Sequence, residues 1–369
     1  MQIVGCGWMA IARDVLILDS TLREGEQAPD VRFTYAQRLQ LAQALDEFGV
    51  NFIEVSTLVS EEQRQLTREL VGMGLKANIV AHLRASTADI DVARQCDATW
   101  IALFLSTSDV HLESKLRMSR EQALELVHET VGYAKAHGLK VRLTCEDASR
   151  TGLNYLYDVC RAAEEAGVDR ISVPDTIGAI TPARMGEMVR GVREHTAVPL
   201  DVHCHNDLGL ALANALAGLE AGASCVHTTI NGVGERCGIV SLAELVMALK
   251  VLYGMEMPVR TEKLVQLSQM LSAFTGIATD EFKPVVGENA FRHKGGTHLA
   301  AVLKNSKTYE AFAPESVGNK RRLVLGEYSG KNVVKYLSEA LGMELDEAGV
   351  QKAIRRLKEK NGDLFEFEL

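Results

Sequence analysis

Eight short apolar runs, separated by longer amphipathic stretches, constrain the fold of this chain more than any other feature. Alternating units of this kind predict a parallel sheet with crossover helices. Most of the predicted helices end at a glycine, the residue that most readily adopts the left-handed helix terminator. The runs are Val15–Asp19, Phe52–Ser56, Ala77–His82, Trp100–Ser106, Val141–Glu146, Ile171–Thr176, Leu200–His205 and Cys225–Ile230. The terminating glycines are Gly49, Gly74, Gly138, Gly167 and Gly222.

Eight strand and helix units in about 250 residues predict an α/β fold, the (β/α)₈ or TIM barrel. A doubly wound open sheet is the alternative, but no G-x-G-x-x-G motif follows the first run and such sheets usually have fewer strands. Two helix starts carry their own signals. Ser119 and Gln122 predict a capping box, and Thr181 with Pro182 predicts an N-cap followed by the first helical residue.

The pattern changes after residue 275. The segment Asp280–Asn319 contains several prolines and glycines and little periodicity, whereas Tyr336–Lys360 returns to helical spacing. We therefore predict a barrel domain over residues 1–275. Over residues 276–369 we predict a loop-rich connector followed by a small helical subdomain.

Composition narrows the class of protein. Apolar residues make up 47% of the chain and charged residues 24%, which is typical of a globular fold and excludes a disordered one. A net charge of −9 argues against nucleic-acid or anionic-membrane partners and favours a small molecule. The seven cysteines lack a C-x-x-C pair, and neither a signal peptide nor a membrane span is indicated. We expect a cytoplasmic protein, and residues 1–13 suggest no role.

Polar residues cluster where a barrel enzyme would keep its chemistry. Catalytic groups of such enzymes lie at the carboxyl ends of the strands and in the loops that follow. The polar residues at these positions predict an enzyme rather than a structural barrel. They are Asp19, Arg23, Glu24, Glu54, His82, Arg142, Thr144, Glu146, Asp175, Thr176, Asp201, His203, His205, Asn206, Asp207 and Asn231.

The seventh run ends in His203-Cys204-His205. Residues i and i+2 of a strand point to the same side, so the two imidazoles can share one divalent ion. A carboxylate from another strand would complete a set of two histidines and one acid. Glu24 is the first candidate and Asp19 the second. The alternative is a pair of hydrogen-bonded core histidines. Cys204 is expected to point away from the site into packing.

The glycine-bearing segment Gly232–Gly238 has two interpretations. It resembles a phosphate-binding loop, but it lacks the Lys-Ser/Thr of a P-loop. We therefore interpret it as a tight active-site turn.

Four motifs in order resemble a known family. They are LDSTLREGEQ at 18–27, HCHND at 203–207, NGVGERCG at 231–238 and HKGGTH at 293–298. The chain from about Val15 to Lys331 is similar to the acyl-CoA-condensing metallolyase barrels that include isopropylmalate, citramalate and homocitrate synthases. The resemblance implies condensation of acetyl-CoA with a 2-oxo acid, followed by thioester hydrolysis. It also implies a homodimer with shared active sites.

Three features are most similar to the homocitrate synthase branch. Glu24 stands where the isopropylmalate and citramalate synthases have aspartate, and Ile239 stands where isopropylmalate synthases have an asparagine that helps to hold the metal. His82 falls where homocitrate synthases meet the distal carboxylate of 2-oxoglutarate. A branched-chain keto acid would leave such a buried donor unpaired. The resemblance therefore implies 2-oxoglutarate as substrate, in lysine biosynthesis or in the supply of a homocitrate cofactor.

The resemblance also implies a role for each site residue. A divalent metal (Mg, Mn, Zn or Co) on Glu24, His203 and His205 would polarise the ketone. Arg23 would stabilise the developing alkoxide. The base that removes the acetyl methyl proton would be His293 of the neighbouring subunit, oriented by Glu146 or Asp201. The substrate-binding residues would be Arg23, His82, Arg142, Thr144 and Thr176.

Several residues depart from the family pattern. Asp201 replaces the usual glutamate, and Leu303 stands at the offset of an expected tyrosine, for which Tyr309 or Tyr328 could substitute. Residues 326–331 differ from the more basic Gly-Lys-His-Ser-Gly. The chain stops short of the regulatory domain of isopropylmalate synthases, so we expect no leucine control through that domain. The departures leave the base, the hydrolytic step and the oxo acid open.

Other functions are compatible with the same motifs. One is a related synthase of the citramalate, isopropylmalate or citrate type, which uses another 2-oxo acid. Another is a metal-dependent lyase or decarboxylase on the same barrel. A non-catalytic binding barrel is least favoured, because only chemistry requires so many convergent ionisable groups.

Overall fold

The computed structural model describes residues 11, 14–326, 328–340, 342–359 and 365–368. The other positions of the first thirteen, including Cys6, and Glu327 of the 326–331 segment lie outside the described residues. The chain divides into two compact units, one of residues 1–260 and 270–277 and the other of 261–269 and 278–369. The domain boundary that we place at residue 275 rests on the sequence pattern and stays a prediction.

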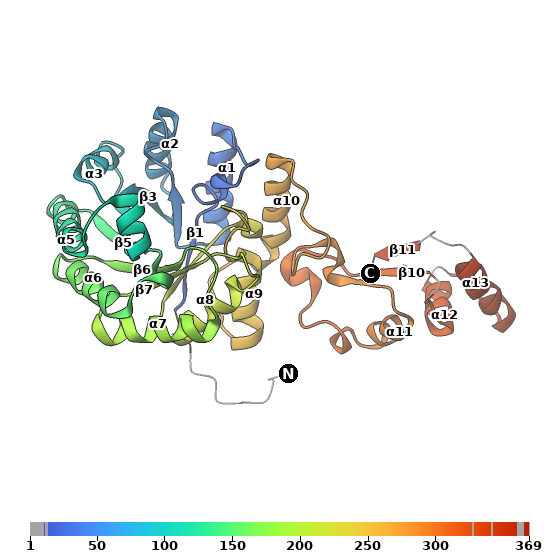
Figure 1. Ribbon diagram of the computed structural model, residues 1–369. Coiled ribbons are helices and arrows are strands. Elements are labelled where there is room, and N and C mark those ends of the chain that lie inside the picture. The colour runs from blue at the N-terminus through green and yellow to red at the C-terminus, as the bar shows by residue number, and fades with distance from the viewer. Residues whose placement is uncertain (1–10, 12–13, 327, 341, 360–364, 369) are drawn as a thin grey trace. The chain divides into compact units, whose positions relative to one another are not determined.

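The first unit is a closed barrel of eight strands, hydrogen-bonded in sequence order. Its neighbouring strands are parallel, and β1 pairs with both β2 and β8. Closure confirms the predicted TIM barrel and excludes the open sheet (Figure 1). The strands are β1 Leu16–Asp19, β2 Phe52–Val55, β3 Asn78–Arg84, β4 Trp100–Ser106, β5 Lys140–Glu146, β6 Arg170–Asp175, β7 Leu200–Cys204 and β8 Cys225–Thr228.

Helices surround the strands, and several of them begin and end at the residues that the sequence predicts. Ser119 and Gln122 form the capping box of α5, and Thr181 caps α7 with Pro182 in its first turn. Gly49 ends α1 with φ of 108°, and a Cβ there would lie 2.6 Å from the carbonyl oxygen of Pro258. The helices are α1 Tyr35–Phe48, α2 Glu61–Gly72, α3 Thr87–Arg94, α4 Asp109–His111, α5 Arg120–Ala136, α6 Leu153–Glu165, α7 Pro182–His195, α8 Ala211–Glu220, α9 Leu242–Tyr253 and α10 Leu264–Thr275.

The strands bury residues on both faces. Val202 and Cys204 of β7 belong to the large apolar core of the unit, so Cys204 points into packing as predicted. A second apolar cluster includes Leu18, Phe52 and Val80. Farther along the same strands the buried residues become ionisable, beginning with Glu54 and Arg142. A barrel interior is normally filled with branched apolar side chains, so this change of character marks the carboxyl end as functional.

The second unit is only partly as predicted. Its helices are α11 Gly296–Lys304, α12 Lys331–Ala340 and α13 Glu347–Glu359, and it also has a three-stranded sheet in the order β11-β10-β9. The strands are β9 Arg292–His293, β10 Arg322–Leu325 and β11 Phe365–Glu368. The sequence analysis did not predict these three strands beside the helices, because such short strands show no measurable alternation. The helical segment predicted at Tyr336–Lys360 is interrupted near Gly342, which has φ of 69°.

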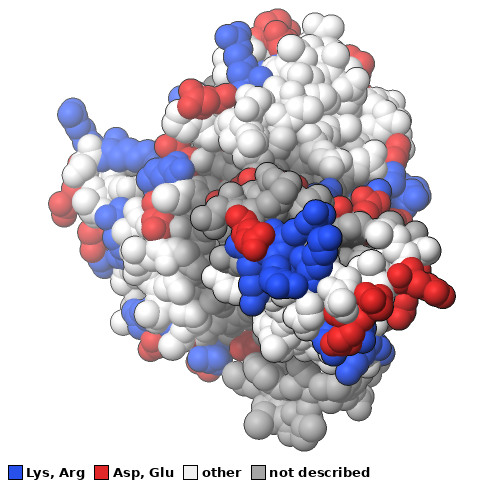
Figure 2. All heavy atoms as spheres, turned by 90° about the vertical axis from the view of Figure 1, so that its right-hand side faces the viewer, with Lys and Arg blue, Asp and Glu red and all other residues white. Residues whose placement is uncertain are grey.

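The surface carries both signs of charge. On the face drawn in Figure 2, basic and acidic side chains lie in small groups among uncharged residues. In the second unit Arg322 pairs with Glu288, and Lys331 pairs with Glu347. No helix in the described part of the chain is both long and apolar enough to cross a bilayer.

Candidate active site

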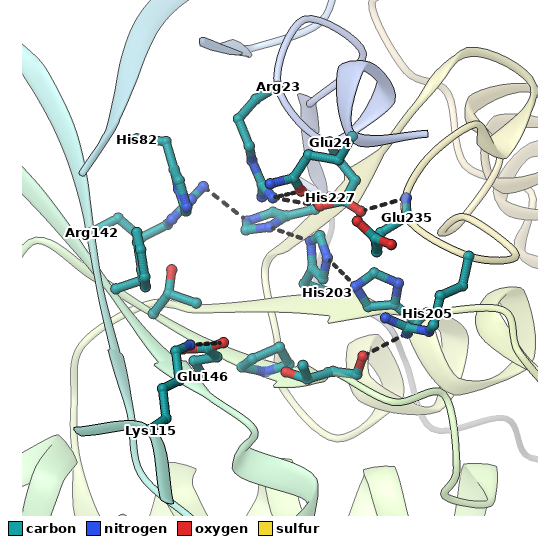
Figure 3. Close-up of a pocket in the computed structure, with 16 residues that line it drawn as sticks. Arg23, Glu24, His82, Lys115, Arg142, Glu146, His203, His205, His227 and Glu235 are labelled. Atoms are coloured by element: carbon teal, nitrogen blue, oxygen red, sulfur yellow. Dashed lines mark hydrogen bonds and ion pairs between the residues drawn. The ribbon is translucent and has the colours of Figure 1, made fainter. Parts of the chain in front are cut away.

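A cavity of about 370 Å³ opens at the carboxyl ends of the barrel strands, inside the first unit. Charged and imidazole side chains from several strands converge on it (Figure 3). Such convergence of ionisable groups is typical of a catalytic site. The lining residues are Arg23, Glu24, Gln27, His82, Phe104, Lys115, Arg142, Thr144, Glu146, Pro174, Thr176, His203, His205, His227, Glu235 and Arg236.

Glu24, His203 and His205 lie together on the cavity wall. Each offers one ligand atom, and these atoms all lie within 4.8 Å of one another. Nε2 of His203 is 3.3 Å from Nε2 of His205. Burial lowers the pKa of both imidazoles, most strongly that of His203, so both are neutral at pH 7 and can offer lone pairs. Two imidazole nitrogens and one carboxylate form a donor set that fits a divalent transition-metal or zinc ion.

The second metal-ligand candidate, Asp19, does not join this group. Its carboxylate is fully buried and accepts the backbone N–H of Thr21 at 2.9 Å. Burial raises the pKa of Asp19 to about 7. Asp19 does not line the cavity, so this sequence alternative is wrong.

The glycine-bearing segment acts as a tight turn against Glu24. The backbone N–H of Glu235 donates to Oε1 of Glu24 at 3.0 Å. Gly238, with φ of 76°, is so close to Gly232 that a Cβ there would lie 1.8 Å from its carbonyl oxygen. The loop therefore fixes the direction of the predicted carboxylate ligand, and our interpretation of an active-site turn fits this geometry.

We expect Gly234→Ala to weaken metal binding. The added Cβ would lie 3.0 Å from Cγ of Glu24 and 3.1 Å from its Oε1, so the carboxylate must move. Loss of such support typically costs about 10-fold or more in metal affinity, which chelator competition would measure. Gly132→Ala in α5 is the matched control, because a Cβ at Gly132 meets no heavy atom within 4 Å. Equal affinities for the two variants would contradict this role of the loop.

Glu54 of β2 is the hub of the buried charges. It is fully buried, and it accepts from Nε of Arg23 at 2.6 Å, from Oγ of Ser20 at 2.6 Å and from Arg142. Burial opposes its ionisation, but the charges of Arg23 and Arg142 hold the pKa of Glu54 well below its usual value. The sequence analysis noted Glu54 without a role. The sequence feature that could have indicated its importance is a single acidic residue within the apolar run FIEV.

The predicted substrate-binding residues all line the cavity. His82 stacks on Phe104 with ring centroids 4.7 Å apart, and its Nδ1 lies 3.4 Å from Oε1 of Glu54. Oγ1 of Thr144 is buried and has no hydrogen-bond partner among the described residues. Oγ1 of Thr176 accepts the backbone N–H of Asp147 at 2.9 Å, which leaves its own proton free to donate.

Glu146 faces the cavity and is held by a cation that the sequence analysis missed. Nζ of Lys115 lies 2.7 Å from each carboxylate oxygen of Glu146, and Ser106 also donates to Glu146. Lys115 lies in the short π-helix Leu112–Leu116, and no motif marked it.

Asp201 requires a correction. It is 1% exposed, does not line the cavity, and accepts from Nε of Arg170 at 2.6 Å. Its other oxygen lies 3.1 Å from Nε2 of His227. Asp201 therefore orients His227 and not the predicted base His293. His227 was missed, although it occupies the second inward position of the run that begins at Cys225.

His293 lies in the second unit, at the end of β9. Its Nε2 is 3.1 Å from Oε1 of Glu310, a partner that the sequence analysis did not suggest. Arg321 also donates to Glu310. Tyr309 stacks on His298 with centroids 3.8 Å apart, Tyr328 is 63% exposed, and Leu303 packs against the core of this unit.

Two family descriptions match the chain. Residues 14–271 match the family described as HMGL-like. Residues 285–363 match the region described as homocitrate synthase post-HMGL domain-like. Together the two matches cover nearly all of the described residues.

Curated relatives are similar over almost the whole chain. The chain is 46% identical to the probable 2-isopropylmalate synthase of Methanopyrus kandleri, over 94% of this chain and 69% of the relative. It is also 46% identical to homocitrate synthase AksA of the same organism, over 95% of this chain and 88% of the relative. The crystal structure of the HMG-CoA lyase of Bacillus subtilis superposes with a TM-score of 0.66 at 18% identity, covering 73% of this chain and 96% of that one. That likeness shows the shared fold.

Proposed function

We propose that this chain, which belongs to the HMGL-like family, is a synthase of the homocitrate type. The proposed reaction condenses acetyl-CoA with 2-oxoglutarate and hydrolyses the thioester, giving homocitrate and CoA. The observation that supports the choice of oxo acid is His82, a half-buried imidazole beside Glu54 in a cavity that Arg23 and Arg142 also line. The imidazole of His82 suits a second carboxylate and would gain no partner from a branched apolar chain.

The proposed cofactor is one divalent cation, Mg, Mn, Zn or Co, held by Glu24, His203 and His205. When bound, it would supply Lewis-acid polarisation of the ketone. Arg23 lies beside this group, paired with Glu24 and Glu54, and would stabilise negative charge that develops on the keto oxygen. Its pKa is raised: burial alone would lower it, but the charges of Glu54 and Glu24 outweigh burial, so Arg23 remains cationic.

The carboxylates of the substrate have matching donors. We assign the carboxylate next to the ketone to the hydroxyls of Thr144 and Thr176, since that of Thr144 is buried and without a partner among the described residues. We assign the distal carboxylate to His82, together with Arg142. Burial and the nearby charge of Arg23 lower the pKa of His82 in the free protein. A bound carboxylate would add an opposite charge and favour the imidazolium.

A base must remove a proton from the acetyl methyl group. We propose His293 of a second copy of the chain for this role, in a homodimer with shared active sites. An imidazole next to a carboxylate suits the task, and His293 has such a partner in Glu310. Glu146, on the cavity wall and charge-paired with Lys115, is the proposed carboxylate on the barrel side.

The choice of oxo acid is tested by a substrate panel. Thiol release from acetyl-CoA would be followed with 2-oxoglutarate, pyruvate, oxaloacetate and 2-oxoisovalerate, on protein stripped of metal and reloaded with each cation in turn. We expect the highest kcat/KM with 2-oxoglutarate. A preference for 2-oxoisovalerate would favour the second candidate, an isopropylmalate synthase, which the equal identity to such a relative supports. Turnover that does not require acetyl-CoA would instead indicate a lyase.

We expect His82→Leu to lower kcat/KM for 2-oxoglutarate by about 10–150-fold, because a hydrogen bond to a charged group contributes about 1.5–3 kcal/mol. Pyruvate has no distal carboxylate, so its kcat/KM should change much less in the same variant. His82→Gln keeps a hydrogen-bond donor, so its kcat/KM for 2-oxoglutarate should lie between those of the wild-type protein and His82→Leu. Equal losses for both oxo acids would refute the assignment of His82 to the distal carboxylate.

A further inference from the structure

A row of three buried side chains leads from Asp201, behind the cavity wall, to His227 and His203, which line the cavity. His227 lies between Asp201 and His203, with its Nε2 3.1 Å from Oδ2 of Asp201 and its Nδ1 3.3 Å from Nδ1 of His203 (Figure 3 shows the two histidines). The exposed fractions are 1% for Asp201, 1% for His227 and 5% for His203. The far nitrogen of His203, Nε2, faces Nε2 of His205 at 3.3 Å. The row therefore ends at an atom of the proposed metal site.

The protons in this row can be counted. A neutral imidazole carries one N–H and one lone pair, so in each of His203 and His227 one ring nitrogen donates and the other accepts. Asp201 is paired with the guanidinium of Arg170, whose Nε lies 2.6 Å from Oδ1, and this opposite charge favours the ionised carboxylate. An ionised carboxylate only accepts hydrogen bonds. Nε2 of His227 must then donate to Asp201, and its Nδ1 must accept from Nδ1 of His203.

One contact favours the opposite arrangement, in which His227 carries its proton on Nδ1 and not on Nε2. Nη1 of Arg142 also lies 3.1 Å from Nε2 of His227, and a guanidinium only donates. If His227 accepted from Arg142, its own proton would sit on Nδ1 and point at His203. His203 would then carry its proton on Nε2, where no lone pair remains for a cation. Asp201 opposes this order, since its carboxylate requires a donor from His227.

Arg170 keeps Asp201 in place for this task. Nε of Arg170 donates to Oδ1 of Asp201 at 2.6 Å, and its Nη2 donates to Oγ of Ser224 at 2.8 Å. The free oxygen of Asp201 is thereby directed at His227. Asp201, Cys225 and His227 could in principle hold a cation of their own, as their ligand atoms lie within 4.8 Å of one another. Burial raises the pKa of the Cys225 thiol well above its usual value, and two guanidiniums flank the group, so a carboxylate and imidazole pair fits better.

We propose that Asp201 and His227 are positioning residues that hold His203 as its Nδ1–H tautomer, with Nε2 ready to bind a divalent cation. This inference rests on the proposed function in one respect, namely that Glu24, His203 and His205 hold the metal. Carboxylates and carbonyls commonly fix metal-binding histidines directly. In this chain an intervening imidazole transmits the effect of the carboxylate to the ligand.

The direct test is the tautomer of His203 in metal-free protein. Long-range ¹⁵N–¹H correlation spectra of protein with labelled histidine distinguish Nδ1–H from Nε2–H, and the loss of signals in His203→Ala identifies the residue. We expect Nδ1–H in the wild-type protein. Nε2–H in the wild-type protein would overturn the proposal.

The second test is Asp201→Asn, which keeps the shape and removes the charge. The amide can donate to Nε2 of His227, so we expect His203 to change to Nε2–H and the affinity for Zn²⁺ or Co²⁺ to fall by about 10–100-fold. Asp201→Glu keeps the carboxylate and should restore most of the affinity. Asp89→Asn is the matched control, as it alters another buried carboxylate, paired with Arg84 and remote from the cavity.

The outcomes separate this inference from the proposed function. If wild-type protein binds the cation and Asp201→Asn binds it equally well with an unchanged tautomer, the positioning role is refuted. If wild-type protein binds no divalent cation, the proposed metal site fails. The tautomer of metal-free His203 would still decide whether the carboxylate controls the ligand.

Discussion

Replacing His203 by alanine is expected to abolish metal binding and to lower kcat by about 10³-fold or more. Glu24, His203 and His205 each offer one ligand atom, and these atoms lie within 4.8 Å of one another. The variant keeps only the ligand atoms of Glu24 and His205. Lewis-acid activation contributes several kcal/mol to such reactions, and each 1.36 kcal/mol corresponds to a factor of ten in rate. Metal content by elemental analysis and thiol release by kinetics would measure the two effects.

The control for this variant is His128→Ala. His128 is an exposed histidine on α5, so its loss should change neither metal content nor rate. Circular dichroism would establish that both variants are folded. A His203→Ala protein that retains stoichiometric metal and near wild-type kcat would refute the metal site and the chemistry proposed for it.

The variant Glu54→Gln is expected to destabilise the fold by about 3–5 kcal/mol, the usual cost of breaking a buried ion pair from one side. Glu54 is fully buried and neutralises Arg23 and Arg142, so the neutral amide leaves buried guanidinium charge uncompensated. Urea unfolding would measure the change. Activity should fall as well, because the same two arginines lose the carboxylate that directs them at the cavity.

The loss of stability in Glu54→Gln should depend on pH. The folded-state pKa of Glu54 lies well below that of an unfolded glutamate, so its carboxylate stabilises the fold fully above the unfolded pKa, near 4.3. Below that pH the unfolded chain takes up the proton first, and the difference between wild type and variant should shrink. The exposed residue Glu129 of α5 supplies the control Glu129→Gln, for which we expect a change within about 0.5 kcal/mol. A loss below about 1 kcal/mol at pH 7 for Glu54→Gln would contradict its role as hub.

These predictions share one physical origin, which is the ionic interior of the barrel. Three buried cations, Arg23, Arg142 and Arg170, face the buried acids Glu24, Glu54 and Asp201. Each charge is expensive to bury alone and acceptable only when paired. The pairing holds Arg23 and Arg142 at the cavity wall while keeping them charged. A substrate that brings carboxylates can therefore bind without first reorganising the wall.

Much of the candidate site follows from local sequence rules. His203 and His205 are two residues apart on one strand, so strand geometry alone places them on the same side. Glu24 could be nominated because it follows the first strand, at the carboxyl end where barrel enzymes place their catalytic groups. The residues that the sequence analysis missed, Lys115 and His227, belong to no motif. Their positions depend on which strands adjoin, and a linear pattern does not contain that information.

The sequence by itself determined the architecture of the first unit, since strand length, helix period, capping residues and terminating glycines are local properties that the backbone obeys wherever the segment lies. It also determined the type of chemistry at the carboxyl ends of the strands. Only the tertiary structure decided how the charges pair: that Glu54 holds two arginines, that Asp201 orients His227 and not His293, and that a turn fixes Glu24. Pairing energies depend on distances of a few ångströms between residues far apart in the chain, and those distances exist only after the barrel has closed.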